Sequence, residues 1–232
     1  MGAPDPSRPE VVIYPYLDDA GQVAFEGVRI IYSNRAECLQ YHRPSGEGDQ
    51  SWLWSLEPGE FMRPAPGNNW FPFDAPKFEG YPATRERKFF DTAAPIIPYQ
   101  LRELRKAVAD NCPIFICKDE DEADFLRSRG LCATCCARGA KAWRAEHARF
   151  LQGANVVLTT GQDHAKILAE SLASVARRMR ILENDAVLDL RTSGDTKKFL
   201  ASIAAAHLRV ILGGKGDHPL LSSPTAMKRN DF

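Results

Sequence analysis

The chain has 232 residues, of which 44% are apolar and 26% charged, an ordinary composition for a globular protein that buries a core. No stretch approaches the roughly 18 continuous apolar residues of a membrane span, and the first ten residues, MGAPDPSRPE, lack the apolar run of a signal peptide. We therefore expect a cytoplasmic protein without a membrane partner.

Charge divides unevenly along the chain. Residues 1–94 carry 9 Lys and Arg against 14 Asp and Glu, whereas residues 95–232 carry 21 against 16. This asymmetry indicates two parts with different surfaces, but it is too mild to require nucleic acid as a partner. The six cysteines do not form the pattern of a small disulfide scaffold, so we expect reduced thiols.

The first part of the chain predicts antiparallel strands. Residues 11–17 and 23–32 are β-branched and aromatic and flank the turn-rich DDAGQ, which favours a hairpin. A third strand is expected at residues 38–41. Residues 51–56, SWLWSL, alternate polar with apolar side chains as a half-buried strand does.

Residues 57–94 combine prolines with many aromatic side chains. The prolines exclude a long regular element, yet the aromatic side chains are too many for a solvated linker. We expect an ordered insertion anchored by Trp70, Phe71, Phe73, Phe78, Tyr81, Phe89 and Phe90.

From residue 95 to 210 helical and strand patterns alternate. We expect helices at 99–109, 121–129, 143–151, 163–178 and 196–207, and strands at 114–117, 131–135, 155–160 and 179–183. Gly130 follows the second helix as a C′ glycine. Strands that are apolar throughout and alternate with helices predict a parallel sheet covered on both faces. The fold class is therefore α+β, a strand-rich region at 1–94 followed by an α/β domain, and residues 211–232 form a tail.

In a parallel α/β sheet, functional groups collect beyond the carboxyl ends of the strands. Three such ends are expected, at residues 117–122, 134–140 and 159–163, and they should lie side by side. The first is conspicuous because the strand IFIC runs directly into KDEDEAD, which holds five carboxylates.

Several local strings resemble the Toprim domain of phage- and plasmid-type DNA primases. They are IFICKDEDEADFLRSRGL, ATCCARGAKAWR and ANVVLTTGQDHAKILAESLASVARRMRILE. The hairpin and SWLW region also resembles the strand-rich region that precedes Toprim in those proteins. The resemblance covers about four-fifths of the chain, leaving out 57–94 and the tail, and it implies a Toprim-like fold after residue 95.

The resemblance also implies a Mg²⁺-dependent phosphoryl-transfer chemistry from which this chain departs. In the family, a glutamate after the first strand acts as acid or base, and an Asp-x-Asp after a later strand holds Mg²⁺. The first glutamate falls on Lys118, and the paired aspartates fall on Thr160 and Gln162. An ammonium cannot bind Mg²⁺, and a hydroxyl and an amide supply no charge.

Some acids remain near the expected positions. Glu120 stands where the family has its second acidic residue. Asp119 and Asp163 each lie one residue beyond a position where the family has a carboxylate. A rebuilt catalytic site from these three residues, with Glu120 and Asp163 as the Mg²⁺ ligands, is one hypothesis. The alternative is that the acids of 119–122 stabilise the positive end of a helix, with Lys118 neutralising its neighbours.

Basic side chains offer a different chemistry. Arg138, Lys141 and Arg144 fall where the family has a Gly-rich loop with a lysine, so with Lys118 they are candidates for binding phosphate or nucleic acid. A surface loop whose basic side chains are merely solvated explains Arg138, Lys141 and Arg144 equally well. The C-x-x-C-C of Cys132, Cys135 and Cys136 lacks the second ligand pair of a zinc site, and buried thiols explain it better.

The hypothesis that follows is a degenerate Toprim-like protein without cofactor or metal-dependent catalysis. It would bind DNA, RNA or a replication protein in a phage, plasmid or other mobile-element system. The alternative is an active Mg²⁺-dependent nucleotidyl or phosphoryl transferase, primase- or nuclease-like, that uses the relocated acids.

Overall fold

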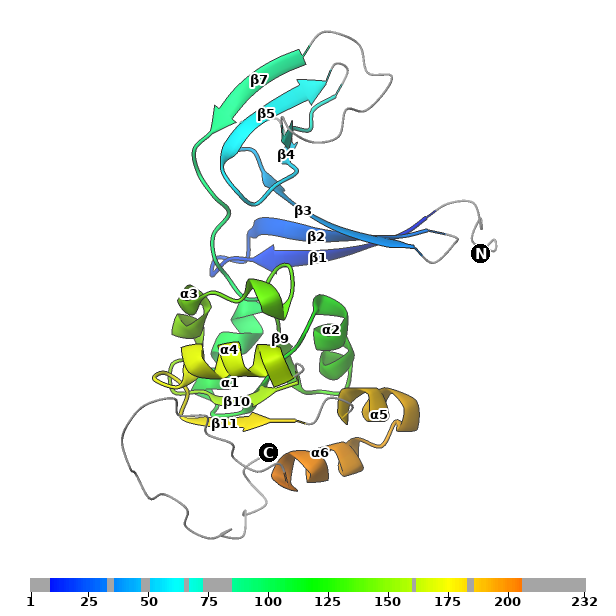
Figure 1. Ribbon diagram of the computed structural model, residues 1–232, viewed down its shortest axis with the longest axis vertical. Helices are drawn as coiled ribbons and strands as arrows, with labels where there is room; N and C mark the ends of the chain where they lie inside the picture. The colour runs from blue at the N-terminus through cyan, green and yellow to red at the C-terminus, as the bar shows by residue number, and fades with distance from the viewer. Residues whose placement is uncertain are drawn as a thin grey trace. The chain divides into compact units, whose positions relative to one another are not determined.

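The computed structural model of the chain divides into two compact units, Met1–Ile97 and Pro98–Phe232 (Figure 1). The N-terminal unit is antiparallel and the C-terminal unit contains a parallel sheet with helices, so the predicted α+β class is confirmed. The structure describes residues 9–32, 36–46, 51–64, 67–72, 85–159, 162–182 and 186–205, with the backbone alone at 64, 85, 162, 163 and 205. The predicted tail, 211–232, lies outside these ranges.

The N-terminal unit begins with a sheet of order β1-β2-β3-β4. Its strands are β1 (Glu10–Leu17), β2 (Val23–Ile31), β3 (Glu37–Pro44) and β4 (Trp52–Leu53). The predicted hairpin is confirmed, since β1 and β2 pair antiparallel across the turn. Tyr14, Tyr16, Phe25 and Tyr41 are buried, and the Tyr16 and Phe25 rings stack with centroids 4.2 Å apart. Residues 51–56 form a shorter strand than predicted, only two residues long.

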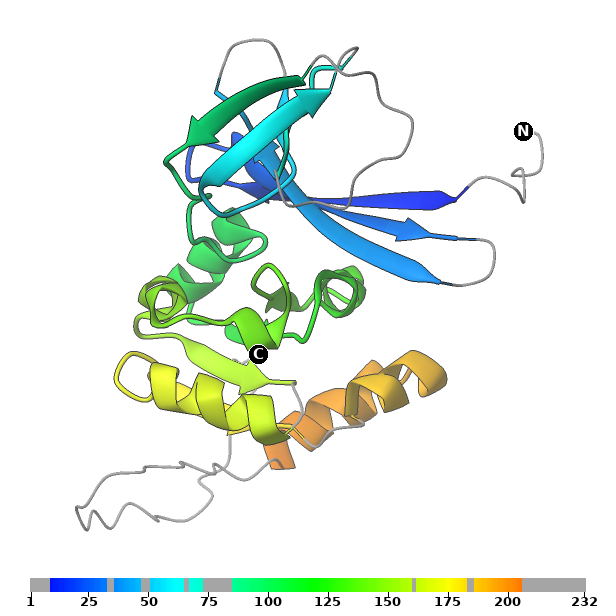
Figure 2. The same cartoon turned by 45° about the horizontal axis from the view of Figure 1, so that its top comes forward.

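The aromatic insertion forms a second, three-stranded sheet of order β6-β5-β7. β5 (Gly59–Pro64) pairs antiparallel with β6 (Phe71–Pro72) and with β7 (Arg85–Phe90), as Figure 2 shows for the cyan and green strands. Leu53, Phe61, Trp70 and Phe90 make one buried cluster that joins β4 to this sheet. The prolines limit strand length, as predicted. Phe61, Trp70 and Phe90 are buried, whereas Phe89, expected as an anchor, is 66% exposed because it points away from this cluster. Phe73, Phe78 and Tyr81 lie outside the described residues.

The C-terminal unit alternates helices and strands. Its elements are α1 (Leu101–Ala109), β8 (Pro113–Ile116), α2 (Glu120–Ser128), β9 (Cys132–Thr134), α3 (Ala145–Ala148), β10 (Asn155–Leu158), α4 (Gln162–Leu172), β11 (Arg178–Ile181), α5 (Ala186–Ser193) and α6 (Thr196–Ala205). The four strands form a parallel sheet of order β11-β10-β8-β9. Gly130 has φ 78°, the left-handed conformation predicted for the residue that ends α2.

The central strands of the sheet are buried on both faces. Successive side chains of a strand point to opposite faces, yet Ile114, Phe115 and Ile116 of β8 are each at most 1% exposed. On one face, Phe115 stacks with Phe199 of α6, with ring centroids 5.9 Å apart. This two-sided burial explains why the strands are apolar throughout rather than alternating.

Strand order reverses beside β8. From β8 the chain moves to β9 on one side and then crosses to β10 on the other. Such a reversal is the topological switch point, where open α/β sheets bind ligands outside the carboxyl ends of their strands. The segment that follows β8, residues 117–122, therefore occupies the middle of this edge, between those that follow β9 and β10.

The helices differ from the sequence prediction in three places: two are shorter than predicted and one is additional. The predicted helix 163–178 ends at Leu172, because residues 175–177 turn back and Arg177 N donates to Ala154 O at 2.8 Å to start β11. The predicted helix 143–151 is only one α-turn, α3, flanked by the short 3₁₀ helices Ala140–Ala142 and Arg149–Leu151. Helix α5 was not predicted.

We expect Leu158→Ala to destabilise the C-terminal unit by about 2–5 kcal/mol, because it leaves a cavity beside the fully buried end of β10. Chemical denaturation followed by the fluorescence of Trp143, the one tryptophan of this unit, measures the change. Leu188→Ala is the matched control, since Leu188 is 58% exposed and its truncation costs about 0.5 kcal/mol or less. Equal effects of the two substitutions would contradict the described packing.

Candidate functional site at the carboxyl edge of the parallel sheet

Backbone hydrogen bonds hold the three strand ends together. Cys117 N donates to Thr134 O at 2.8 Å, which joins the end of β8 to the end of β9. Thr159 N donates to Ile116 O at 3.1 Å, which joins the ends of β8 and β10. The predicted neighbourhood of these segments is thus present, with the β8 end at its centre.

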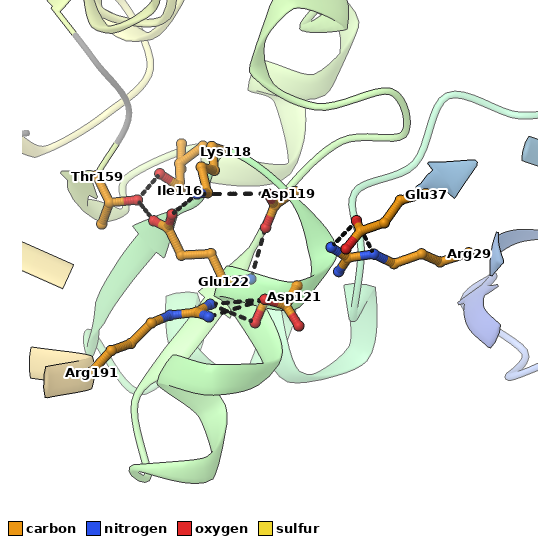
Figure 3. A network of polar contacts seen from close by, with 9 residues as sticks. All are labelled: Arg29, Glu37, Ile116, Lys118, Asp119, Asp121, Glu122, Thr159 and Arg191. Atoms are coloured by element: carbon orange, nitrogen blue, oxygen red, sulfur yellow. Dashed lines mark hydrogen bonds and ion pairs between the residues drawn. The ribbon is translucent and has the colours of Figure 1, made fainter. Parts of the chain in front are cut away.

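Lys118 lies at the middle of the edge with its side chain 64% exposed. Its Nζ is 3.9 Å from an Asp119 carboxylate oxygen and 3.9 Å from a Glu122 carboxylate oxygen (Figure 3). The ammonium therefore places positive charge between two acids directly beyond the strand. This is the kind of position that a metal ion takes in a carboxylate site.

Asp119 caps helix α2. Its backbone is extended and its Oδ1 accepts a hydrogen bond from Glu122 N at 2.8 Å, which satisfies one of the free N–H groups at the helix start. Two further acids, Glu120 and Asp121, stand in the first turn, where the helix dipole favours negative charge. The prediction that the acidic run stabilises a helix start is confirmed for Asp119.

Glu122 is the acid that the sequence did not single out. Its carboxyl group is buried, and the Thr159 hydroxyl donates to its Oε1 while lying 3.1 Å from the Ile116 carbonyl oxygen. One hydroxyl proton cannot serve both acceptors. A protonated Glu122 satisfies both, because it can donate to Thr159, which then donates to Ile116.

Burial also acts on the pKa of Glu122. Burial raises this pKa above its ordinary value, while the Thr159 hydrogen bond and the Lys118 charge offset the burial only in part. The buried Cys117 thiol beside it also has a raised pKa, mainly from burial, so it is not poised as a nucleophile.

The structure describes the side chain of Glu120 but not that of Asp163. Glu120 is 1% exposed, and its charge adds to the burial that raises the pKa of the Cys136 thiol to about 12. Asp163 is the second residue of α4, and its side chain, like Thr160, lies outside the described residues. Among the side chains that the structure describes, no group of three or more His, Cys, Asp or Glu is arranged to hold a metal ion.

A loop from the end of β9 is fastened to Lys118. Ala140 N donates to Lys118 O at 3.2 Å, and Gly139 has φ 76°. A Cβ at residue 139 would lie 2.7 Å from Lys118 O, so only glycine permits this approach. The candidate basic residues Arg138, Lys141 and Arg144 are exposed on or beside this loop.

The other candidates have structural roles. Cys132, Cys135 and Cys136 are all free thiols, and the last two are buried, in agreement with the prediction of reduced, packed cysteines. His147 is buried, and its Nδ1 accepts from Arg144 N at 3.0 Å. The unpredicted helix α5 contributes Arg191, whose two terminal nitrogens lie 3.1 Å from one Asp121 oxygen.

Comparison with known protein families, with curated proteins and with solved structures finds no match to this chain. The Toprim resemblance thus stays a prediction. In the described part of the chain, no helix is both long and apolar enough to cross a membrane.

We expect Glu122→Gln to change how stability depends on pH. A buried acid with a raised pKa favours folding when protonated, so its contribution is full below the unfolded pKa of about 4.3 and falls as pH rises toward the folded value. Glutamine cannot ionise. The difference in unfolding free energy, variant minus native chain, should therefore increase as the pH rises through this window. Denaturation of both proteins between pH 4 and pH 8 measures it.

Glu103→Gln is the control, because Glu103 is exposed on α1 and its side chain is 55% accessible. A difference between Glu122→Gln and the native chain that stays constant with pH would show that Glu122 ionises normally.

Proposed function

We propose that this protein is a catalytically degenerate Toprim-like protein that binds nucleic acid through phosphate contacts at the carboxyl edge of its parallel sheet. The observation that carries the proposal is the position of Lys118. Its ammonium lies 3.9 Å from the acids Asp119 and Glu122 at the end of β8, beside the switch point. A cation there repels a divalent metal ion and competes with it for the Asp119 carboxylate.

The remaining acids support the loss of metal chemistry. Asp119 uses one oxygen to cap α2, Glu120 is buried, and Glu122 is shared with Thr159. Mg²⁺ binds several oxygen ligands in near-octahedral geometry and usually keeps some of its water. Acids committed to hydrogen bonds and burial do not offer it such a shell.

The basic groups support a phosphate ligand. Lys118 follows β8, and the loop carrying Arg138 and Lys141 is attached to the Lys118 backbone carbonyl. Cations that converge on a switch point suit the phosphates of a nucleic acid, because phosphate contacts position a protein without reading sequence. The Toprim resemblance places such a protein in a phage, plasmid or replication system.

The first test measures DNA and RNA binding as a function of salt. We expect the affinity of the full chain for a single-stranded oligonucleotide to fall as salt rises, and Arg138→Ala/Lys141→Ala/Arg144→Ala to weaken binding. For each phosphate that the variant no longer binds, the slope of log K against log salt should decrease by roughly 0.7. Fluorescence anisotropy at several salt concentrations measures both effects.

The matched control removes three exposed basic residues elsewhere in the same unit, Arg178→Ala/Lys197→Ala/Lys198→Ala. Equal weakening by both triple variants would indicate nonspecific charge attraction. A salt-resistant complex with a protein, with no affinity for oligonucleotides, would instead favour an interaction protein.

The second test addresses the active enzyme built from Asp119, Glu120 and Asp163. We expect no saturable Mg²⁺ or Mn²⁺ binding by calorimetry and no metal-dependent primase or nuclease activity in the native chain. Lys118→Glu supplies the family's missing carboxylate and removes the competing cation, so it is the variant most able to gain Mn²⁺ affinity. Metal binding by the native chain that Glu120→Ala and Asp163→Ala abolish would establish the enzyme and reject the degenerate site.

A further inference from the structure

The N-terminal unit contains a buried cation without an anion. Arg43 of β3 is 6% exposed, although arginine is almost never buried so fully unless it is paired. Within the described part of the chain, its guanidinium donates through Nη2 to the Thr92 carbonyl oxygen and has no carboxylate partner. Its Nε is buried and has no acceptor at all among the described residues. Burial lowers the pKa of Arg43, and no neighbouring charge offsets the effect.

A second unused donor lies close by in the sheet. Trp70 is completely buried, and its indole Nε1 has no acceptor among the described residues. Arg43 pairs with Leu53, and Leu53 bridges to Trp70, so the three residues sit on adjacent segments. Cross-strand partners project to the same face, which places Arg43 and Trp70 on either side of Leu53 toward one core.

Arg63 lies beside Trp70. The Arg63 guanidinium carbon lies 4.8 Å from the centre of the Trp70 ring. Other arginines of the unit have the partners that Arg43 lacks, since Arg63 pairs with Glu86 and Arg29 with Glu37. Unpaired buried donors are rare in native proteins, and the buried charge of Arg43 together with the unused Nε–H and indole N–H matches an acceptor that carries negative charge.

We propose that Arg43 and Trp70 form a binding site for an oxyanion, a phosphate or a carboxylate group of a ligand, in the N-terminal unit. The Thr92 carbonyl fixes the guanidinium through Nη2, which leaves Nε–H to meet one anion oxygen. The indole N–H of Trp70 donates to a second oxygen of the same anion. The site involves no residue of the parallel sheet and stands independently of the nucleic-acid function proposed above.

The test is calorimetric titration of the full chain with inorganic phosphate and with acetate at constant ionic strength. We expect saturable binding of at least one of them, and the stronger of the two identifies the kind of oxyanion. Arg43→Met, similar in length but neutral, should abolish binding. Trp70→Phe, which keeps an aromatic ring but removes the N–H, should weaken it about tenfold, as loss of a hydrogen bond to a charged group does.

Arg29→Gln is the control and should bind as the native chain does, because Arg29 already has Glu37 as its partner. Stability without ligand provides a second readout. A buried unpaired cation opposes folding, so Arg43→Met should be at least as stable as the native chain in anion-free buffer. If Arg43→Met does not fold, Arg43→Lys, which keeps the charge but lacks Nε, should still lose most of the binding.

Two results would overturn the site. One is the absence of saturable binding of either anion by the native chain, or binding that Arg43→Met leaves intact. The other is an experimental structure in which a carboxylate of the chain itself contacts Arg43 Nε.

Discussion

The parallel pairing of β8 with both β9 and β10 is the constraint on which the C-terminal unit depends. Because β8 lies between β9 and β10 and runs parallel to both, its carboxyl end lies beside the carboxyl ends of these two strands. Backbone hydrogen bonds from Cys117 N to Thr134 O and from Thr159 N to Ile116 O then fix where the segment beyond Ile116 begins. Strand order therefore determines which segments form the site, and the side chains determine its chemistry.

Within that frame, the residues beyond β8 largely neutralise one another. A capping aspartate, a buried glutamate with a raised pKa and an exposed lysine leave little unbalanced negative charge at the edge. Positive charge, by contrast, is presented outward by Lys118 and by the loop attached to it. The electrostatic character of the edge thus differs from that of a carboxylate site built around a metal.

The sequence predicts the hairpin, the parallel sheet and the segments at its edge, because these follow from local apolar periodicity and turn residues. It does not predict α5, whose apolar pattern is weak and whose contact with α2, from Arg191 to Asp121, spans 70 residues of the chain. Glu122 is also missed, since within a run of five acids nothing local distinguishes the one that becomes buried. Its burial requires Thr159, which only the β8–β10 pairing brings near. The same limit applies to Arg43, an ordinary basic residue of a strand until the partners around it are known.

Strand order also has a consequence for how the chain reaches this fold. β8 can pair with β9 as soon as α2 has formed between them, a closure of about 20 residues, but its other neighbour lies roughly 40 residues downstream. Parallel contacts of such separation form slowly, and until they do one long edge of β8 has open backbone groups. During synthesis, the edge of β8 that pairs with Asn155–Leu158 can be covered only after those residues have been made. Charged residues such as those that follow Ile116 are of the kind that discourage wrong pairing of an open strand edge.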